Sequence, residues 1–163
     1  VDHAIIISAG CVIHPYATID ASKGPITLGE YCVVEEGASI VNEVSHKYHP
    51  QRQLTIGGFN YFGPRTSIRS CSIGVGNRFL ADASTGTMSV VGDHCVLHLR
   101  SRITHDVQLP DRTAVTLDRN GVSLWLPREH IDTAAERDDQ IKISRFYRSV
   151  LHGGRNLEKP LKQ

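Results

Sequence analysis

The sequence predicts an all-β solenoid built from triangular coils and followed by a single C-terminal α-helix. Three observations carry this prediction. Between Ile7 and Val115 apolar residues recur every six positions, and glycines take fixed places within this period. From about residue 133 the spacing of the apolar residues becomes helical. A fixed short period marks a repeat architecture, because each unit buries its apolar face only against its neighbours.

Each six-residue unit opens with an aliphatic or aromatic residue and has a small residue four places later, as in Ile13 and Ala17. This period is neither the two of a plain strand nor the 3.6 of a helix. Each unit then supplies one short strand and one corner, three units close a coil, and the opening residue points inward. About six coils would share one continuous core, formed by Ile7, Ile13, Ile19, Leu28, Val34, Ile40, Ile56, Phe62, Ile73, Phe79, Val91, Leu97, Ile103 and Leu109.

Glycines and interruptions add detail to this repeat. Glycines that follow an opening position, such as Gly57 and Gly74, suit corners that need a positive φ or a close backbone approach. About three extra residues bulge around 23–25, where a Gly-Pro pair favours a turn. The polar stretch 43–53 breaks the pattern and is expected to be a surface loop. The predicted organisation is a solenoid over 1–120, including the loop 43–53, and a second part over 121–163.

The second part begins with a connector and continues as a helix. The register of sixes fails at Gly121, and the connector SLWLPREHID follows. Thr133 and Glu136 have the spacing of a capping box, which predicts a helix that starts there and runs to about Leu151. Gly153-Gly154 would end it, before a polar tail. A stripe at helical spacing is expected to pack the helix on the solenoid: Ile143, Phe146, Tyr147, Val150 and Leu151.

Composition narrows the functional classes. The 163 residues suffice for one domain and carry a formal net charge of +1, so no strong field attracts nucleic acid or an anionic membrane. No apolar run is long enough for membrane insertion, and no secretory signal is expected at the start. The first residue is valine, so we expect the natural chain to begin before Val1. The four cysteines form no CxxC pair; buried free thiols in a reducing, cytosolic compartment are expected.

Hexapeptide solenoids include acyltransferases, zinc carbonic anhydrases and non-enzymatic interaction proteins, so the fold alone does not choose a function. A zinc site of the gamma-type carbonic anhydrases needs two histidines five positions apart and a third about one coil earlier. His94 and His98 are four apart, and neither they nor His105 complete the set of three ligands. An acyltransferase needs a general base, for which the loop offers His46 and His49. We therefore predict no enzyme and no catalytic, cofactor or metal residue, with an acyltransferase as the alternative.

The stretch VIHPYATIDASKGPITLGEYCVVEEGASIVN at 12–42 resembles the small β-helical subunits of the pointed-end complex of dynactin. The resemblance includes IHP, the GPI bulge, the EE pair before a small residue, and LTIGGFNYF at 54–62 after a long loop. It extends to LPREH and to IKISRFYRSVLHGGRNLEKPLK near the C-terminus, whereas residues 63–117 match in period only. The hexapeptide period itself resembles that of left-handed parallel β-helices, and the left hand rests on this resemblance.

The resemblance implies a non-catalytic scaffold without a cofactor, located in the cytoplasm and on the cytoskeleton. The implied partners are dynactin subunit 5, dynactin subunit 4 and the pointed-end actin-related protein. In such a hetero-oligomer the chain would support dynein-driven transport and cargo attachment on microtubules. Dynactin subunit 5 is itself a β-helical relative, so the choice between the two small subunits stays open at this point.

Overall fold

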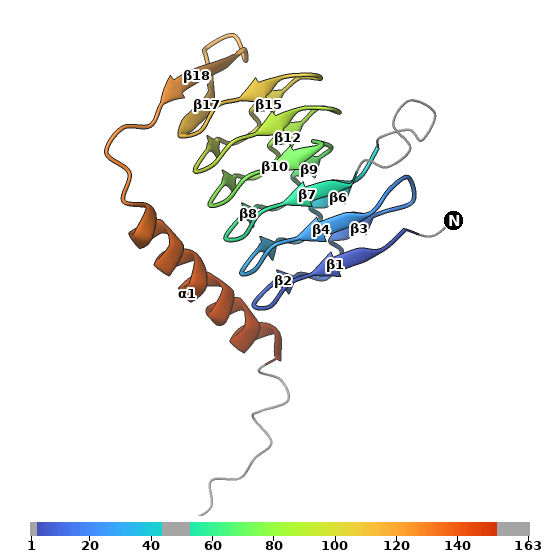
Figure 1. Cartoon of the computed structure of the whole chain (residues 1–163). Coiled ribbons are helices and arrows are strands. Elements are labelled where there is room, and N and C mark those ends of the chain that lie inside the picture. Colours follow the sequence, from blue (N-terminus) through green and yellow to red (C-terminus); the bar gives the residue numbers. More distant parts are fainter. Residues whose placement is uncertain (1–2, 44–52, 153–163) are drawn as a thin grey trace, which may run out of the picture.

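A parallel β-solenoid and one α-helix make up the part of the chain that the computed structural model describes, residues 3–43 and 53–152 (Figure 1). The solenoid is a left-handed β-helix of the hexapeptide-repeat type with about five turns. The all-β fold class and the C-terminal helix predicted from the sequence are thus confirmed. The predicted loop lies outside the described residues, apart from Glu43 and Gln53 at its edges.

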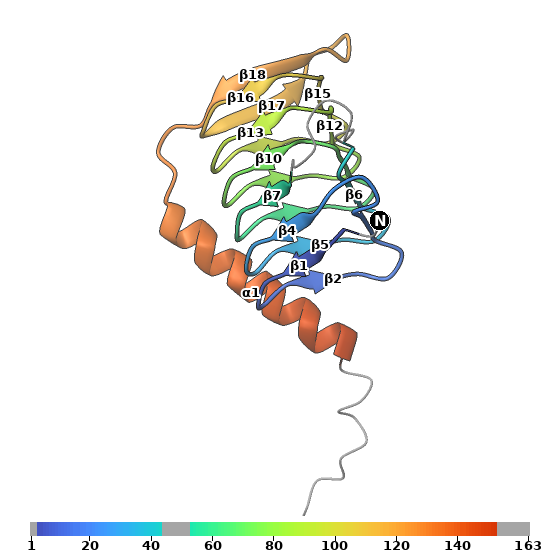
Figure 2. The same ribbon diagram turned by 45° about the vertical axis from the view of Figure 1, so that its right-hand side comes forward.

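Three parallel sheets form the sides of the solenoid, and each of the first five coils gives one short strand to each sheet, whereas the last coil gives strands only to the first two (Figure 2). Sheet A contains the first strand of every coil: β1 Ile5–Ile7, β4 Ile26–Leu28, β7 Leu54–Ile56, β10 Ser72–Ile73, β13 Val90–Val91 and β16 Gln108–Leu109. Sheet B contains the second: β2 Val12–Ile13, β5 Val33–Val34, β8 Tyr61–Phe62, β11 Arg78–Phe79, β14 Val96–Leu97 and β17 Thr113–Leu117, with β18 Ser123–Pro127 at its edge. Sheet C contains the third: β3 Thr18–Asp20, β6 Ser39–Val41, β9 Ser67–Ile68, β12 Ser84–Thr85 and β15 Arg102–Ile103.

Equivalent opening residues stack between neighbouring coils and fill the interior. Ile73 pairs with Val91, and Phe79 pairs with Leu97. The rings of Phe62 and Phe79 stack with their centroids 5.0 Å apart. Most of the expected core positions are almost inaccessible to solvent: Leu28, Val34, Ile40, Ile56, Phe62, Ile73, Phe79, Val91, Leu97, Ile103 and Leu109.

The first coil departs from the expected core. Ile7 is 45% exposed, and Ile13 and Ile19 are only partly buried. Ile7 does stack on Leu28 of the second coil. Its other side faces the end of the solenoid, where no described coil continues the stack. The hexapeptide pattern gives the direction of a side chain but not its place in the stack, so the prediction that Ile7 is buried was wrong.

The corner between sheets A and B, which we call the A–B corner, shows why glycines recur at fixed places in the repeat. The residues at positive φ here include aromatic and charged side chains, among them Tyr31, Phe59 and His94, as well as Gly76. Gly74, which precedes this position, has a different role. A Cβ on Gly74 would lie 2.8 Å from the carbonyl carbon of Gly92 in the next coil. Gly74 therefore serves the close backbone approach of two coils rather than a left-handed conformation.

A column of small polar side chains lines the inner side of the A–B corner. The Nδ2 group of Asn60 donates to the carbonyl oxygens of Gly57 and Gly74, each at 2.8 Å. Its Oδ1 accepts a hydrogen bond of 2.8 Å from the backbone N–H of Asn77. The Oδ1 of Asn77 in turn accepts from the backbone N–H of Cys95 at 2.7 Å. Backbone groups that leave the strand ladders at the corner are thus paired inside the core, as buried polar groups must be.

The last coil ends in a hairpin that the sequence did not predict. Residues 123–127, expected to belong to a connector, form β18, which pairs antiparallel with β17. Trp125 of β18 and Ile103 of β15 line the same small cavity of about 290 Å³ at this end of the solenoid. Leu124, Trp125 and Leu126 remain between 45% and 51% exposed.

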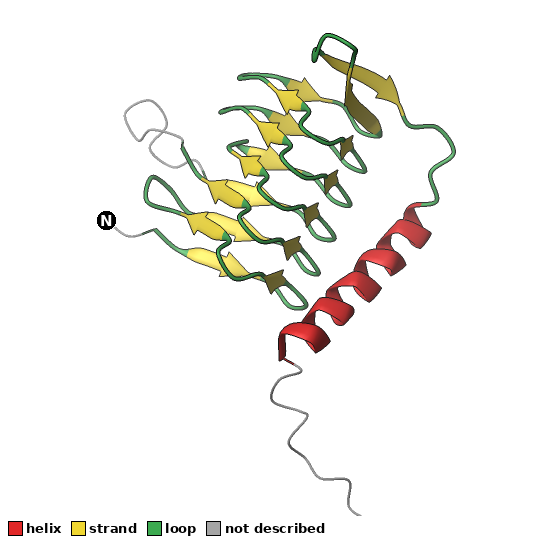
Figure 3. Ribbon diagram, turned by 180° about the vertical axis from the view of Figure 1, so that it is seen from behind, coloured by secondary structure: helices red, strands yellow, loops and turns green. Residues whose placement is uncertain are grey.

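Helix α1, Thr133–His152, runs back along the solenoid over the A–B corners (Figure 3). Its first turn lies near His94 of the fifth coil, and Ser144 reaches Gly10 of the first. A helix of 20 residues is about 30 Å long, which is enough to cross this stack of coils. No helix in the described ranges is long and apolar enough to cross a membrane.

The polar column generates a stability prediction. Asn60→Ala should lower the free energy of unfolding by about 3 kcal/mol, because three hydrogen bonds are lost and their backbone partners stay buried. Urea unfolding followed by circular dichroism measures the change. Asn120→Ala in the exposed final turn is the matched control and should change stability by less than about 0.5 kcal/mol. Equal effects of the two substitutions would contradict the role of the column.

Candidate functional site

The contact between helix α1 and the A–B corners is the most elaborate arrangement of polar side chains in the described chain, and it starts at Asp132. The Oδ1 of Asp132 accepts a 3.0 Å hydrogen bond from the N–H of Ala135, so Asp132 caps the helix. The expected capping box of Thr133 and Glu136 does not form. The carboxylate of Glu136 instead lies 2.5 Å from Nη2 of Arg128 and 3.3 Å from Nδ1 of His94. Arg128 also donates to the carbonyl oxygen of His94.

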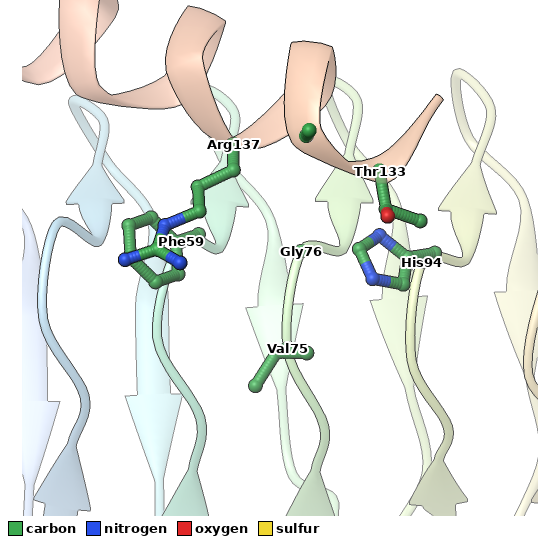
Figure 4. Close-up of a pocket in the computed structure, with 7 residues that line it drawn as sticks. Phe59, Val75, Gly76, His94, Thr133 and Arg137 are labelled. Atoms are coloured by element: carbon green, nitrogen blue, oxygen red, sulfur yellow. The ribbon is translucent and has the colours of Figure 1, made fainter. Parts of the chain in front are cut away.

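A small pocket lies under this end of the helix (Figure 4). Its volume is about 360 Å³, and its walls come from the A–B corners and the first helical turns. The guanidinium of Arg137 lies over the ring of Phe59, 4.6 Å from its centre. Gly76 lines the pocket next to His94, and a Cβ on Gly76 would lie 2.6 Å from Nδ1 of that histidine. The guanidinium of Arg137 and the imidazole of His94 therefore both contribute to the contact between the helix and the solenoid.

The middle of the helix docks through two buried polar side chains. The Nε2 group of Gln140 donates to the carbonyl oxygens of Tyr31 and Asn60, at 3.2 and 3.1 Å. One turn later the hydroxyl of Ser144 donates to the carbonyl oxygen of Gly10. Gln140 is 2% exposed and Ser144 is fully buried. Carbonyls at three successive corners thus accept hydrogen bonds from the helix, and that of Asn60 also accepts one from the N–H of Val33.

A buried carboxylate anchors the C-terminal half of the helix. Glu35, just after β5, accepts hydrogen bonds from the hydroxyls of Tyr61 and Tyr147, the former at 3.0 Å. Nδ1 of His14 lies 3.6 Å from its other oxygen. The rings of His14 and Tyr147 meet edge to face, with centroids 4.6 Å apart. This Glu35 cluster joins the first three coils to the helix.

Both tyrosines in the Glu35 cluster are held in the neutral form. Burial and the carboxylate of Glu35 raise the pKa of Tyr61 well above its ordinary value. The hydrogen bond to Glu35 raises the pKa of Tyr147 as well. A phenolate beside a carboxylate would be repelled and would lose its hydrogen bond, so ionisation of either tyrosine opposes docking.

The apolar stripe of the helix does not provide the contact that the sequence predicts. Ile143 and Tyr147 are partly buried, but Phe146, Val150 and Leu151 are 62%, 57% and 40% exposed. The expectation that Phe146, Val150 and Leu151 pack on the solenoid was wrong, whereas Tyr147 of the same stripe does contact it through Glu35 and His14. The opening side chains point into the solenoid, so the outer face of each corner presents backbone carbonyls. Hydrogen-bond donors fit that surface better than a phenylalanine ring does.

The residues weighed for catalysis do not come together. His94 lies under the helix with Glu136, His98 is exposed, and Nδ1 of His105 accepts from the N–H of Thr87. His46 and His49 lie outside the described residues. In residues 3–43 and 53–152 no group of three histidine, cysteine or acidic side chains could hold a metal ion.

The cysteines are free, and they differ in burial. Cys32 and Cys95 are fully buried, whereas Cys11 and Cys71 are only partly buried. Burial raises the pKa of Cys95. The sulfur of Cys11 lies 3.0 Å from the carbonyl oxygen of Gly29, and that of Cys32 lies 3.3 Å from Gly57 O. These thiols therefore belong to the same inner column as Asn60.

Sequence reasoning named Tyr147 among the residues that hold the helix but missed Gln140 and Ser144. Gln140, Ser144 and Tyr147 follow one another at intervals of four and three, which places them on one helical face. That polar spacing is a readable signal in the sequence, and Tyr147 belongs both to it and to the apolar stripe. Glu35 gave no signal, because its partners are 26 and 112 residues away in the sequence.

The chain is similar in sequence to dynactin subunit 6 from Nematostella vectensis, with 30% identity over 116 residues, or 68% of this chain and 63% of the relative. It is also similar to dynactin subunit 6 from Caenorhabditis elegans, with 36% identity over 93 residues, and from Danio rerio, with 27% identity over 117 residues. These two matches cover 57% and 68% of this chain, and 42% and 60% of the relatives. The chain thus spans less than two thirds of the length of these relatives.

No protein-family profile matches the sequence. Among solved structures, a hexapeptide transferase family protein from Anaplasma phagocytophilum superposes with a TM-score of 0.49 at 13% identity, covering 88% of this chain and 98% of that one. A putative acetyltransferase from Bacillus cereus superposes with a TM-score of 0.41 at 13% identity, covering 90% and 98%. At these scores the solved structures carry no argument about function.

The docking contacts predict which substitutions release the helix. Gln140→Ala should lower stability by about 1–3 kcal/mol, because the Tyr31 carbonyl loses its donor and the Asn60 carbonyl keeps only the N–H of Val33. Phe146→Ala should cost less than about 1 kcal/mol, since that ring is largely exposed. Hydrogen exchange across 133–152 should accelerate in the first variant and remain unchanged in the second. A larger effect of Phe146→Ala would restore the apolar docking mode.

The two tyrosines predict a loss of stability in alkali. Their pKa values are raised on folding, so the unfolded chain releases these protons first as the pH rises. The stabilising contribution is complete below about pH 10, the ordinary tyrosine pKa, and is lost progressively above it. Free energies of unfolding between pH 8 and 11.5 should therefore fall less steeply in Tyr61→Phe than in the unmodified chain. Tyr16→Phe, at a side chain that is 84% exposed, is the control, and an equal flattening there would refute the assignment.

Proposed function

Because the chain is similar in sequence to dynactin subunit 6, we propose that it is a non-catalytic scaffold subunit of a dynactin pointed-end complex. In that role it would join other subunits and would support dynein-driven transport and cargo attachment on microtubules. The sequence similarity to three animal proteins of that name is the observation that carries the proposal.

The geometry supports an interaction role. Stacked coils form a stiff rod, because each coil is packed against its neighbours over three sheets. The helix is tied along this rod by Glu136 near its start, Gln140 in its middle and Tyr147 toward its end. A rod with a fixed helix along one edge holds binding surfaces at set distances from one another. His94, the histidine under the helix, pairs with Glu136, so its imidazole is occupied in docking.

The partners we propose are dynactin subunit 5, dynactin subunit 4 and the pointed-end actin-related protein. The complex would be a hetero-oligomer in the cytoplasm, associated with the cytoskeleton. Enzymes of the hexapeptide type place their sites between identical subunits, whereas a scaffold in a mixed complex needs one copy of each surface. We therefore propose that the isolated chain is a monomer.

Affinity capture from cells tests this proposal. A tagged full chain at native expression level should recover the other dynactin subunits in near-equal amounts, as measured by quantitative mass spectrometry. The tag alone and an untagged chain are the controls. Recovery without any dynactin subunit, or sedimentation of the purified chain as a stable homotrimer, would count against a scaffold role in dynactin.

A further inference from the structure

The exposed side of helix α1 borders a groove on the outer face of sheet B. The groove has a volume of about 490 Å³ and is lined by Tyr61, Arg78, Lys142, Ile143, Phe146 and Tyr147. Tyr61 and Arg78 come from β8 and β11, and the other four come from the helix. We call this surface the helix–sheet groove.

Aromatic and aliphatic side chains make up much of the groove, and the ring of Phe146, 62% exposed, is not needed to hold the helix. The rings of Phe146 and Tyr147 meet edge to face with centroids 5.7 Å apart. Tyr147 is fixed from below by Glu35, so the neighbouring ring of Phe146 stands on a rigid base. The apolar surface continues one turn along the helix to Val150, which is 57% exposed. Exposed, contiguous apolar surface of this kind marks interaction sites.

The charges around the groove are mainly positive. Arg78 lines it from the sheet and Lys142 from the helix. Within the described ranges no carboxylate oxygen lies within 4 Å of Arg78. Lys142 makes one exposed contact of 3.6 Å with Asp139. The carboxylate of Glu35 is buried beneath its tyrosines. A carboxylate-bearing partner therefore finds complementary charge here.

We propose that the helix–sheet groove binds an acidic segment of a partner protein, with an apolar side chain of that segment against Phe146 and Ile143. Carboxylates on the segment would pair with Arg78 and Lys142. The groove is open along the helix toward Val150, which suits a peptide chain with several anchor points better than a compact small molecule. The identity of the partner as a dynactin subunit rests on the function proposed above, whereas the chemistry of the surface rests on these residues alone.

Photo-crosslinking in cells tests the groove directly. The full chain carries p-benzoylphenylalanine in place of Phe146, and a matched control carries it in place of Leu99, which is 60% exposed on a corner of the solenoid. Position 146 should crosslink to one protein at a segment that combines acidic and apolar residues, and position 99 should not. Crosslinks from position 146 only to basic segments, or equal labelling of that protein from both positions, would overturn the proposal.

A charge reversal distinguishes charge complementarity with the partner from nonspecific apolar association. Arg78→Glu combined with Lys142→Glu should reduce the yield of the crosslink from position 146 by about tenfold or more. Reversal of Arg119 in the exposed final turn should not reduce it. Hydrogen exchange of the helix should be unchanged in the reversed chain, since neither residue contributes to docking. An unaltered crosslink in the reversed chain would refute the acidic partner.

The outcomes distinguish this inference from the proposed function. Capture of dynactin subunits by both the unmodified and the charge-reversed chain, without a specific crosslink at position 146, would sustain the scaffold role and refute the groove. A specific, charge-dependent crosslink to an acidic segment of a protein outside dynactin, together with capture that recovers no dynactin subunit, would sustain the groove and refute the scaffold role. If the chain captures no dynactin subunit and position 146 gives no specific crosslink, both proposals are overturned.

Discussion

The pairing of backbone groups at the A–B corner is the constraint on which the rest of this structure depends. Strands of two or three residues end there, and the chain turns with a residue at positive φ, so carbonyl groups leave the ladders of the sheets. On the inner side, Asn60 and its neighbours in the column satisfy these groups. On the outer side, Gln140 and Ser144 of the helix donate to the carbonyls of Tyr31 and Gly10. Both sets of hydrogen bonds avoid the same free-energy penalty, that of burying a polar group without a hydrogen-bond partner.

This constraint gives helix α1 two different faces. The docking face is polar and specific, because each donor must meet a carbonyl at a set place along the rod. It fixes the helix in rotation and in register with the coils. The apolar residues Phe146 and Val150 are consequently turned outward and are held there by contacts in which they take no part. A surface held rigidly in advance loses little conformational freedom when a partner binds.

The Glu35 cluster connects these two faces. Its carboxylate is shared between Tyr61 on the solenoid and Tyr147 on the helix, and both tyrosines also line the helix–sheet groove. The docking contact and the proposed binding surface therefore share side chains. Loss of the buried carboxylate would disturb the shape of the groove as well as the attachment of the helix.

The sequence by itself determined the solenoid, most of its core and the position of the helix. A period of six residues reports which side chains point inward, because each coil repeats the same strand and corner, and this held for residues from Leu28 to Leu109. Only the tertiary structure decided the exposure of Ile7, the strand pairing of 123–127 and the face on which the helix docks. Each of these depends on what lies opposite a residue rather than on its own neighbours. A helix with one apolar and one polar stripe can dock by either, and here the carbonyls of the corners selected Gln140 and Ser144 over Phe146.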